Sequence, residues 1–71
     1  MPLTMVEAGR RVRLVAVNAG HGLRVRLAEL GLIPGVEFEV VSKNSHGPCI
    51  LDVKGSRVVI GHGMAMKMDV Q

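Results

Sequence analysis

The stretch RLAELGLIPG, residues 26–35, decides the fold of this chain, because it predicts a helix, the end of that helix and the turn that follows. Leu23, Leu27 and Leu30 recur at i, i+4 and i+7, which lines one face of a short amphipathic helix. Gly31 stands where a left-handed residue ends a helix, and the leucine after it then packs back against Leu27, as in the Schellman motif. The helix and its end are therefore encoded locally.

Residues 33–36 predict a type II turn that leads into a strand. Pro34 stands at the second position of this turn and Gly35 at the third, because proline presets φ and glycine accepts a positive φ. Through residues 36–40, apolar side chains then alternate with two glutamates. This period of two predicts a strand with one buried and one exposed face.

The rest of the chain predicts further short strands. Residues 10–17 alternate in the same way, and residues 54–56 form a tight turn between two apolar runs, which predicts a hairpin. We therefore predict one mostly-β domain, residues 1–71, folded as a small, partly open β-barrel of about five strands with one short α-helix. The predicted strands are residues 10–17, 36–40, 49–53, 57–60 and 64–70.

The last of these runs is rich in methionine. Met64, Met66 and Met68 alternate with other residues, which places them on one face of a strand. We expect that face to pack in the core, in preference to a role as copper(I) ligands. The first residues of the run could instead form a single helical turn.

Composition bears on the compartment and on membrane contact. Cys49 is the only cysteine, so no internal disulfide can form, and the N-terminus does not resemble a secretion signal. No apolar run reaches the ~18 residues that a bilayer-crossing helix needs. We expect a cytoplasmic protein that does not insert into a membrane.

The residue types argue against several functions. Phe38 is the only aromatic residue, so the chain lacks both the aromatic groove that binds proline-rich peptides and the stacking platforms that hold single-stranded nucleic acid. The net charge is +3, which leaves nucleic-acid binding a weak alternative. No glycine-rich loop ends in Lys-Ser or Lys-Thr, and no serine or cysteine has a catalytic signature around it. We expect neither GTP binding nor enzymatic activity.

Five arginines could form one basic patch. In the alternative, Glu37 and Glu39 on the neighbouring strand pair with the arginines opposite them, and the face is an ordinary solvated surface of mixed charge. The alternative is favoured because charge runs usually mark such a surface. The five arginines are Arg10, Arg11, Arg13, Arg24 and Arg26.

Three histidines, each followed by glycine, suggest a possible metal site. In an antiparallel meander His46 and His62 fall at one end of the barrel and His21 at the other, so His46, Cys49 and His62 form the only possible cluster. Cys49 alternates in phase with buried residues, and three ligands at this spacing match no standard site. We expect ordinary surface histidines, an inert thiol and no cofactor, with ferrous iron or zinc as the alternative.

Taken together, these motifs resemble the FeoA family of ferrous iron transport proteins. The resemblance rests on RLAELGLIPG at residues 26–35, VEFEVV at residues 36–41, Gly47-Pro48, and the ending G-x-x-x-A-x-x-M-x-V at residues 61–70. It implies an SH3-like barrel, a cytoplasmic location and an accessory role beside FeoB, the membrane ferrous iron permease that carries a cytosolic GTP-binding domain.

The function favoured by this resemblance is a binding module that contacts the permease, or a protein associated with it, through the helix and turn. Leu27, Leu30 and Leu32 are expected to dock the helix onto the barrel. The exposed residues expected to contact the partner are Arg24, Arg26, Glu29, Ile33 and Pro34.

Other interpretations of the motif and of the chain stay open. The motif could be purely structural, because each of its features is also a folding signal. The chain could instead be a ferrous iron or zinc sensor or carrier, or a regulator linked to nucleic acid. It could also form a homo-oligomer if the methionine face is partly exposed.

Overall fold

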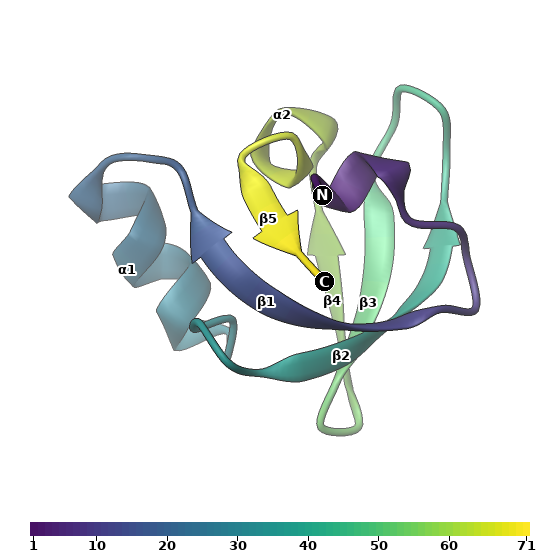
Figure 1. Cartoon of the computed structure of the whole chain (residues 1–71), viewed down its shortest axis with the longest axis horizontal. Helices are drawn as coiled ribbons and strands as arrows, with labels where there is room; N and C mark the ends of the chain where they lie inside the picture. Colours follow the sequence, from purple (N-terminus) through teal and green to yellow (C-terminus); the bar gives the residue numbers. More distant parts are fainter.

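Five antiparallel strands form one curled sheet in the computed structural model, which describes all of residues 1–71 (Figure 1). Their order across the sheet is β4-β3-β2-β1-β5, so the first strand lies between the second and the last. The two edge strands are not paired with each other, and the barrel is partly open. The predicted mostly-β, SH3-like fold is confirmed. The strands are β1 (Arg11–Val17), β2 (Glu37–Lys43), β3 (Cys49–Val53), β4 (Ser56–Ile60) and β5 (Met68–Val70).

Three helical segments connect or cover these strands. The main helix, α1 (His21–Glu29), joins β1 to β2 and projects from one side of the barrel (Figure 1). The short α2 (His62–Ala65) joins β4 to β5, and the 3₁₀ turn η1 (Leu3–Met5) packs beside it. None of these helices has the length and apolar character that a membrane-crossing helix requires.

The core consists of aliphatic side chains and a single aromatic ring. It contains 16 buried residues, all of them apolar, and Phe38 is completely buried among them. In β1 the predicted alternation is confirmed, since Val12 and Leu14 are buried whereas Arg11 and Arg13 are exposed. The fold therefore depends on apolar surface removed from water, worth about 25 cal/mol per Å².

The end of α1 has the geometry that the sequence predicts. The Leu32 amide donates a hydrogen bond to the Leu27 carbonyl at 2.9 Å, and the Gly31 amide donates to the Ala28 carbonyl at 2.9 Å. These are the two bonds of a Schellman motif, and Gly31 has the required positive φ of 88°. The turn after it is also confirmed, because the Val36 amide donates to the Ile33 carbonyl and the glycine between them has a φ of 97°.

Leu30, in contrast, does not dock the helix, and that prediction is wrong. It is 47% exposed, whereas Leu27 and Leu32 are fully buried and Leu23 is partly buried against the core. The reason is that α1 ends at Glu29. The chain reverses just after Leu30, and the reversal turns Leu32 toward the core in its place.

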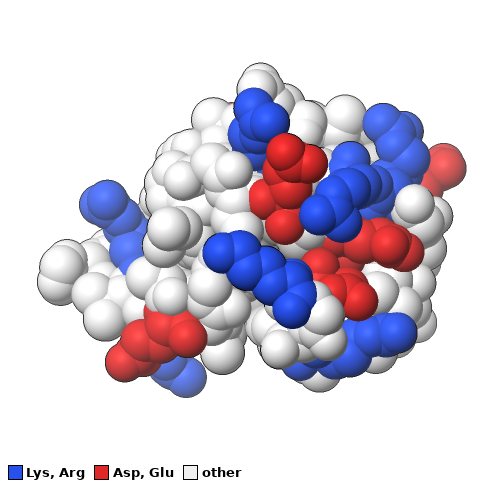
Figure 2. Space-filling model, turned by 90° about the horizontal axis from the view of Figure 1, so that it is seen from below, with Lys and Arg blue, Asp and Glu red and all other residues white.

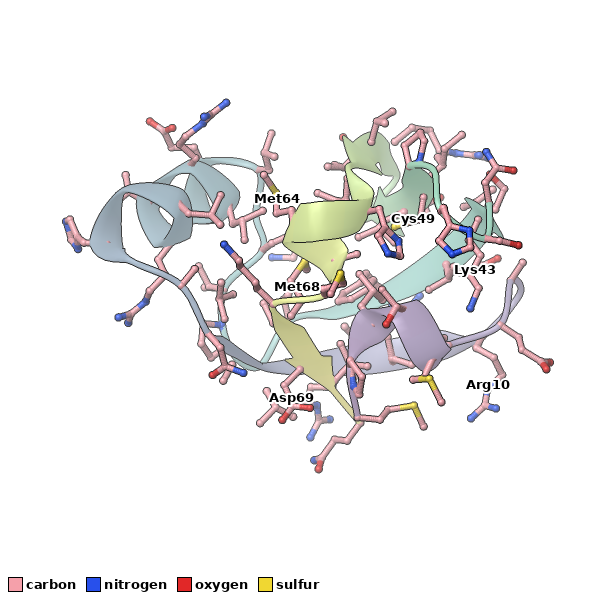
Figure 3. All side chains as sticks on the ribbon, turned by 90° about the horizontal axis from the view of Figure 1, so that it is seen from above. Arg10, Lys43, Cys49, Met64, Met68 and Asp69 are labelled. Carbon is pink, nitrogen blue, oxygen red and sulfur yellow. The ribbon has the colours of Figure 1, made fainter.

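The prediction for the methionine run is also wrong in part. Residues 62–65 form α2, so the helical turn that the sequence left open is the structure adopted. Ala65 at the end of α2 and Met68 at the start of β5 are both buried, whereas Met66, which follows the helix directly, is 59% exposed. Met64 is partly buried against the core; Figure 3 labels Met64 on α2 and Met68 on β5.

The N-terminal segment belongs to the core, although its sequence shows no clear periodicity. Leu3 and Val6 are buried at 2% and 4% exposure. Lys43, at the end of β2, holds this segment in place, because its ammonium group donates hydrogen bonds to the carbonyls of Thr4 at 2.8 Å and Val6 at 2.7 Å. Lys43 therefore links β2 to the N-terminal segment.

Candidate functional site

A groove runs between α1, the end of β1 and the turn that follows the helix. Its volume is about 460 Å³, and its walls are mainly apolar. We call it the helix–turn groove. Its lining includes Ala16, Arg24, Val25, Ala28, Ile33 and Pro34.

All five residues predicted to contact a partner are exposed, but the structure brings only three of them into this groove. Arg24, Ile33 and Pro34 line it. Arg26 and Glu29 lie on other parts of the surface of α1 and do not line the groove. The predicted contact surface therefore divides into a groove and a flanking charged part of the helix.

Among the groove residues that sequence reasoning missed, two are exposed apolar residues of α1, Val25 and Ala28. Both are exposed on α1, and Val25 retains 41% of its surface. Their positions lie off the leucine face that identified the helix. Val25 and Ala28 lie three positions apart, so they form a second apolar face on this short helix. That spacing was the signal in the sequence that could have indicated them. Ile33, 51% exposed, extends this apolar surface beyond the helix end.

The charges near α1 differ from those on the strands. On the sheet, Glu37 forms ion pairs with Arg13 at 3.1 Å and with Arg11 at 3.6 Å, whereas Glu39 forms none. The hydrogen bond and charge of Arg13 hold the pKa of Glu37 below its ordinary value, and Arg11 adds to the effect. Acidic side chains also lie among the basic ones on the face seen in Figure 2. The strands therefore form a surface of mixed charge and not a single basic patch.

On the helix, by contrast, Arg24 and Arg26 have no carboxylate within ion-pair distance. Arg24 lines the helix–turn groove beside apolar side chains. An arginine that keeps its donors free next to exposed apolar surface is suited to bind a carboxylate on another molecule.

The three residues considered for a metal site lie at the opposite end from α1, but they do not form one cluster. The rings of His46 and His62 have their centres 5.8 Å apart. Cys49 is only 6% exposed, and burial raises the pKa of its thiol. No group of three or more His, Cys, Asp or Glu side chains is placed to hold a metal ion. His21 starts α1 and lines the helix–turn groove.

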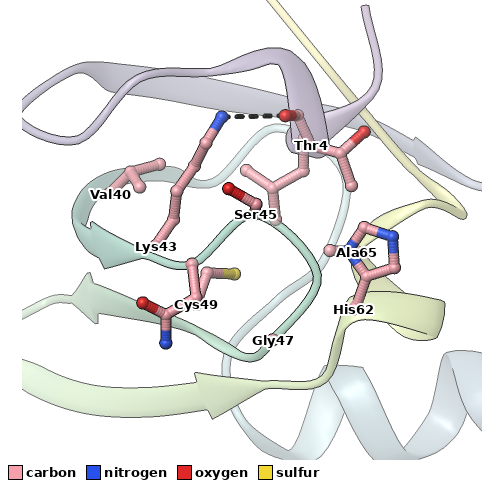
Figure 4. Close-up of a pocket in the computed structure, with 10 residues that line it drawn as sticks. Thr4, Val40, Lys43, Ser45, Gly47, Cys49, His62 and Ala65 are labelled. Carbon is pink, nitrogen blue, oxygen red and sulfur yellow. Dashed lines mark hydrogen bonds between the residues drawn. The ribbon is translucent and has the colours of Figure 1, made fainter.

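A small pocket lies beside His62. It has a volume of about 30 Å³ and is lined by residues that include Lys43, Ser45, Cys49 and His62 (Figure 4). A space of this size holds about one water molecule. No substrate of ordinary size fits in it.

Comparison with known proteins places the chain in a family. Residues 1–71 match the model of the FeoA domain. A protein of Methanocaldococcus jannaschii named "Putative Fe(2+) transport protein A" is 37% identical over 70 residues, which cover 99% of this chain and 84% of that protein.

Solved structures agree with this family. A crystal structure of an iron uptake regulatory protein, FeoA, matches with a TM-score of 0.93 and 34% identity, over 100% of this chain and 95% of that one. The solution structure of FeoA from Chlorobium tepidum matches with a TM-score of 0.90 and 28% identity, over 100% of this chain and 69% of that one. The chain, matched from end to end, is thus a member of the FeoA family.

Proposed function

We propose that this protein is a cytoplasmic accessory protein of ferrous iron uptake, which binds a FeoB-type permease and regulates it by contact. The helix–turn groove is the binding surface, and we assign the protein no catalytic reaction of its own. Family membership supports the link to iron transport, since the related protein of M. jannaschii is named for that process. The observation that supports the surface is the unpaired Arg24 beside exposed apolar side chains.

The composition of the helix–turn groove agrees with that of protein interfaces. Such interfaces join an apolar centre to a polar rim, and arginine is enriched in them. Here Val25 and Ile33 supply the exposed apolar surface, and Arg24 supplies a charge at its edge. The partner surface that fits is one with apolar side chains next to a carboxylate.

Regulation of a GTPase by this surface follows a known chemical route. An arginine that reaches the nucleotide of a GTPase stabilises the negative charge that develops during hydrolysis. Arg24 and Arg26 are exposed on α1 and are free to take this role. The proposal therefore includes stimulation of GTP hydrolysis by the permease.

Affinity capture from detergent-solubilised membranes of the source cells tests the proposal. The wild-type protein should retain a permease with a GTP-binding domain and stimulate its GTP hydrolysis. The double variant R24A/R26A should keep the wild-type circular dichroism spectrum and lose both capture and stimulation.

Two further variants make this test specific. R10A/K67A removes two positive charges that form no ion pair and lie outside the groove, so it is matched in charge and should retain the permease. Ile33→Ala should weaken binding of the permease. The expected loss is roughly 1 kcal/mol or more, which is the cost of truncating a residue that contributes strongly to an interface. Equal loss in the charge-matched control, or full retention by R24A/R26A, would contradict the assignment of the groove.

A further inference from the structure

His46 and His62 come from distant parts of the sequence and meet at one end of the barrel. His46 lies in the loop between β2 and β3, and His62 is the first residue of α2. Their ring centres are 5.8 Å apart and their ring planes are tilted by 52°. His46 is exposed and His62 is partly exposed, so both rings are accessible to an ion from solvent.

This separation matches that of two imidazoles on one metal ion. A zinc–nitrogen bond measures about 2.0–2.1 Å, which puts each ring centre about 3 Å from the metal and two ring centres about 5–6 Å apart at ordinary bond angles. The ring planes are tilted and not stacked, which is compatible with two rings that bind one ion.

The surroundings of the pair decide which ions fit and how tightly. Imidazole nitrogen favours Zn²⁺, Co²⁺, Ni²⁺, Fe²⁺ and Cu²⁺ over Mg²⁺ or Ca²⁺. No carboxylate joins the two histidines in a group that could hold a metal, and none lines the pocket beside His62, so the protein does not neutralise the charge of a bound ion. The ammonium of Lys43 is directed toward the Thr4 carbonyl and away from His62 (Figure 4), so it does not occupy the site.

Cys49 does not complete the site. Its side chain is buried in the core, and burial disfavours the thiolate that a metal would bind. Only two protein ligands are therefore on hand, and water or a group from another molecule fills the remaining positions. Such a site exchanges its ion easily.

We propose that His46 and His62 form a low-affinity, exchangeable site for a divalent transition-metal ion. An ion bound there would tie the β2–β3 loop to α2. The site lies away from the helix–turn groove, so this inference stands or falls independently of the proposed binding partner.

Titration of the full chain with Zn²⁺, followed by isothermal calorimetry, tests the site, with Co²⁺ absorption as a second reading of the ligand set. We expect one ion per chain. His46→Ala and His62→Ala should each weaken binding by about tenfold or more, since even changes outside the ligand shell cost about 10–100-fold. His62→Gln repeats the test with a side chain of similar size, in case alanine disturbs α2.

His21→Ala is the matched control, because it removes an exposed histidine from the same His-Gly dipeptide at the other end of the barrel. It should leave the affinity unchanged, and so should Cys49→Ser. The inference is wrong if Zn²⁺ binding is absent, if it survives loss of either proposed ligand, or if it is weakened equally by His21→Ala. A Co²⁺ spectrum with a thiolate band that Cys49→Ser abolishes would also overturn the two-histidine site.

Discussion

Replacement of Gly31 by alanine should destabilise the protein, although the added methyl group has room. The new Cβ would lie 3.5 Å from Cγ1 of Val53, which is an ordinary contact. The cost arises from the backbone, because Gly31 has a φ of 88° and must keep it for the Leu32 amide to reach the Leu27 carbonyl. A residue with a side chain loses about 1–2 kcal/mol in this left-handed conformation.

Gly22→Ala provides the opposite case within the same helix. Gly22 lies in the first turn of α1, has no positive φ, and no atom lies within 4 Å of the place that a Cβ would take. Alanine there should stabilise by about 0.4–1 kcal/mol, because it reduces the freedom of the unfolded chain. The same chemical change at two glycines, one in the helix and one in its cap, should therefore shift stability in opposite directions.

Urea unfolding monitored by far-ultraviolet circular dichroism measures both effects, since the chain has no Trp or Tyr for fluorescence. In a domain of this size 1 kcal/mol corresponds to about 4–8 °C in Tm, so thermal scans should separate the two variants clearly. If Gly31→Ala were as stable as the wild type, the assigned cost of the left-handed cap would be refuted. A change in the urea dependence itself would instead indicate an altered unfolded state.

Three other substitutions test separate parts of the structure. Phe38→Ala removes the only aromatic ring of the core and should lower the free energy of unfolding by about 3–5 kcal/mol, measured by urea unfolding. A loss of less than roughly 1 kcal/mol would mean that neighbouring side chains repack into the space. Pairing with Arg13 lowers the folded-state pKa of Glu37, so Glu37→Gln should lower stability in full above the unfolded-state pKa of this carboxyl. The difference from wild type should shrink below that value and vanish as pH falls through the lowered folded-state pKa; a difference that persists in acid would contradict the ion pair. Lys43→Met should cost about 1 kcal/mol and speed amide hydrogen exchange in the N-terminal segment, whereas Lys67→Met, which removes a lysine without such hydrogen bonds, should change neither.

Much of the fold could be predicted because its signals are local. The cap at Gly31 and the turn at Pro34 and Gly35 depend on backbone preferences of single residues. The alternation in β1 and β2 follows from the geometry of any strand with one buried face. These features need no knowledge of the rest of the chain.

The errors fall where burial depends on packing between distant segments. Leu30 has the right spacing for the helix face, yet its exposure is fixed by where the chain reverses. Met66 follows a strand pattern, yet a helical turn precedes it and directs it outward. Leu3 is buried only because β5, α2 and Lys43 lie nearby, and no local pattern records those contacts.

The candidate site was predictable to a similar extent. Exposure of Arg24, Ile33 and Pro34 follows from the helix and turn, so local reasoning was enough to expect them on the surface. The groove between them also needs Ala16 of β1, which reaches it only through the tertiary fold. The order of the strands likewise brings His46 and His62 to one end of the barrel, but the 5.8 Å separation of their ring centres is set by the tertiary fold.

The position of β1 between β2 and β5 has a consequence for how the chain folds. Its partner on one side, β5, contains nearly the last residues, and Leu14 pairs with Val70. Closing so long a loop carries an entropic cost before any contact compensates it. Proteins dominated by such distant pairings fold slowly for their size, in about milliseconds to seconds. During synthesis on the ribosome, the β2–β3–β4 meander would be able to form first. The edge of β1 that pairs with β5 would stay unpaired until β5 had been synthesised.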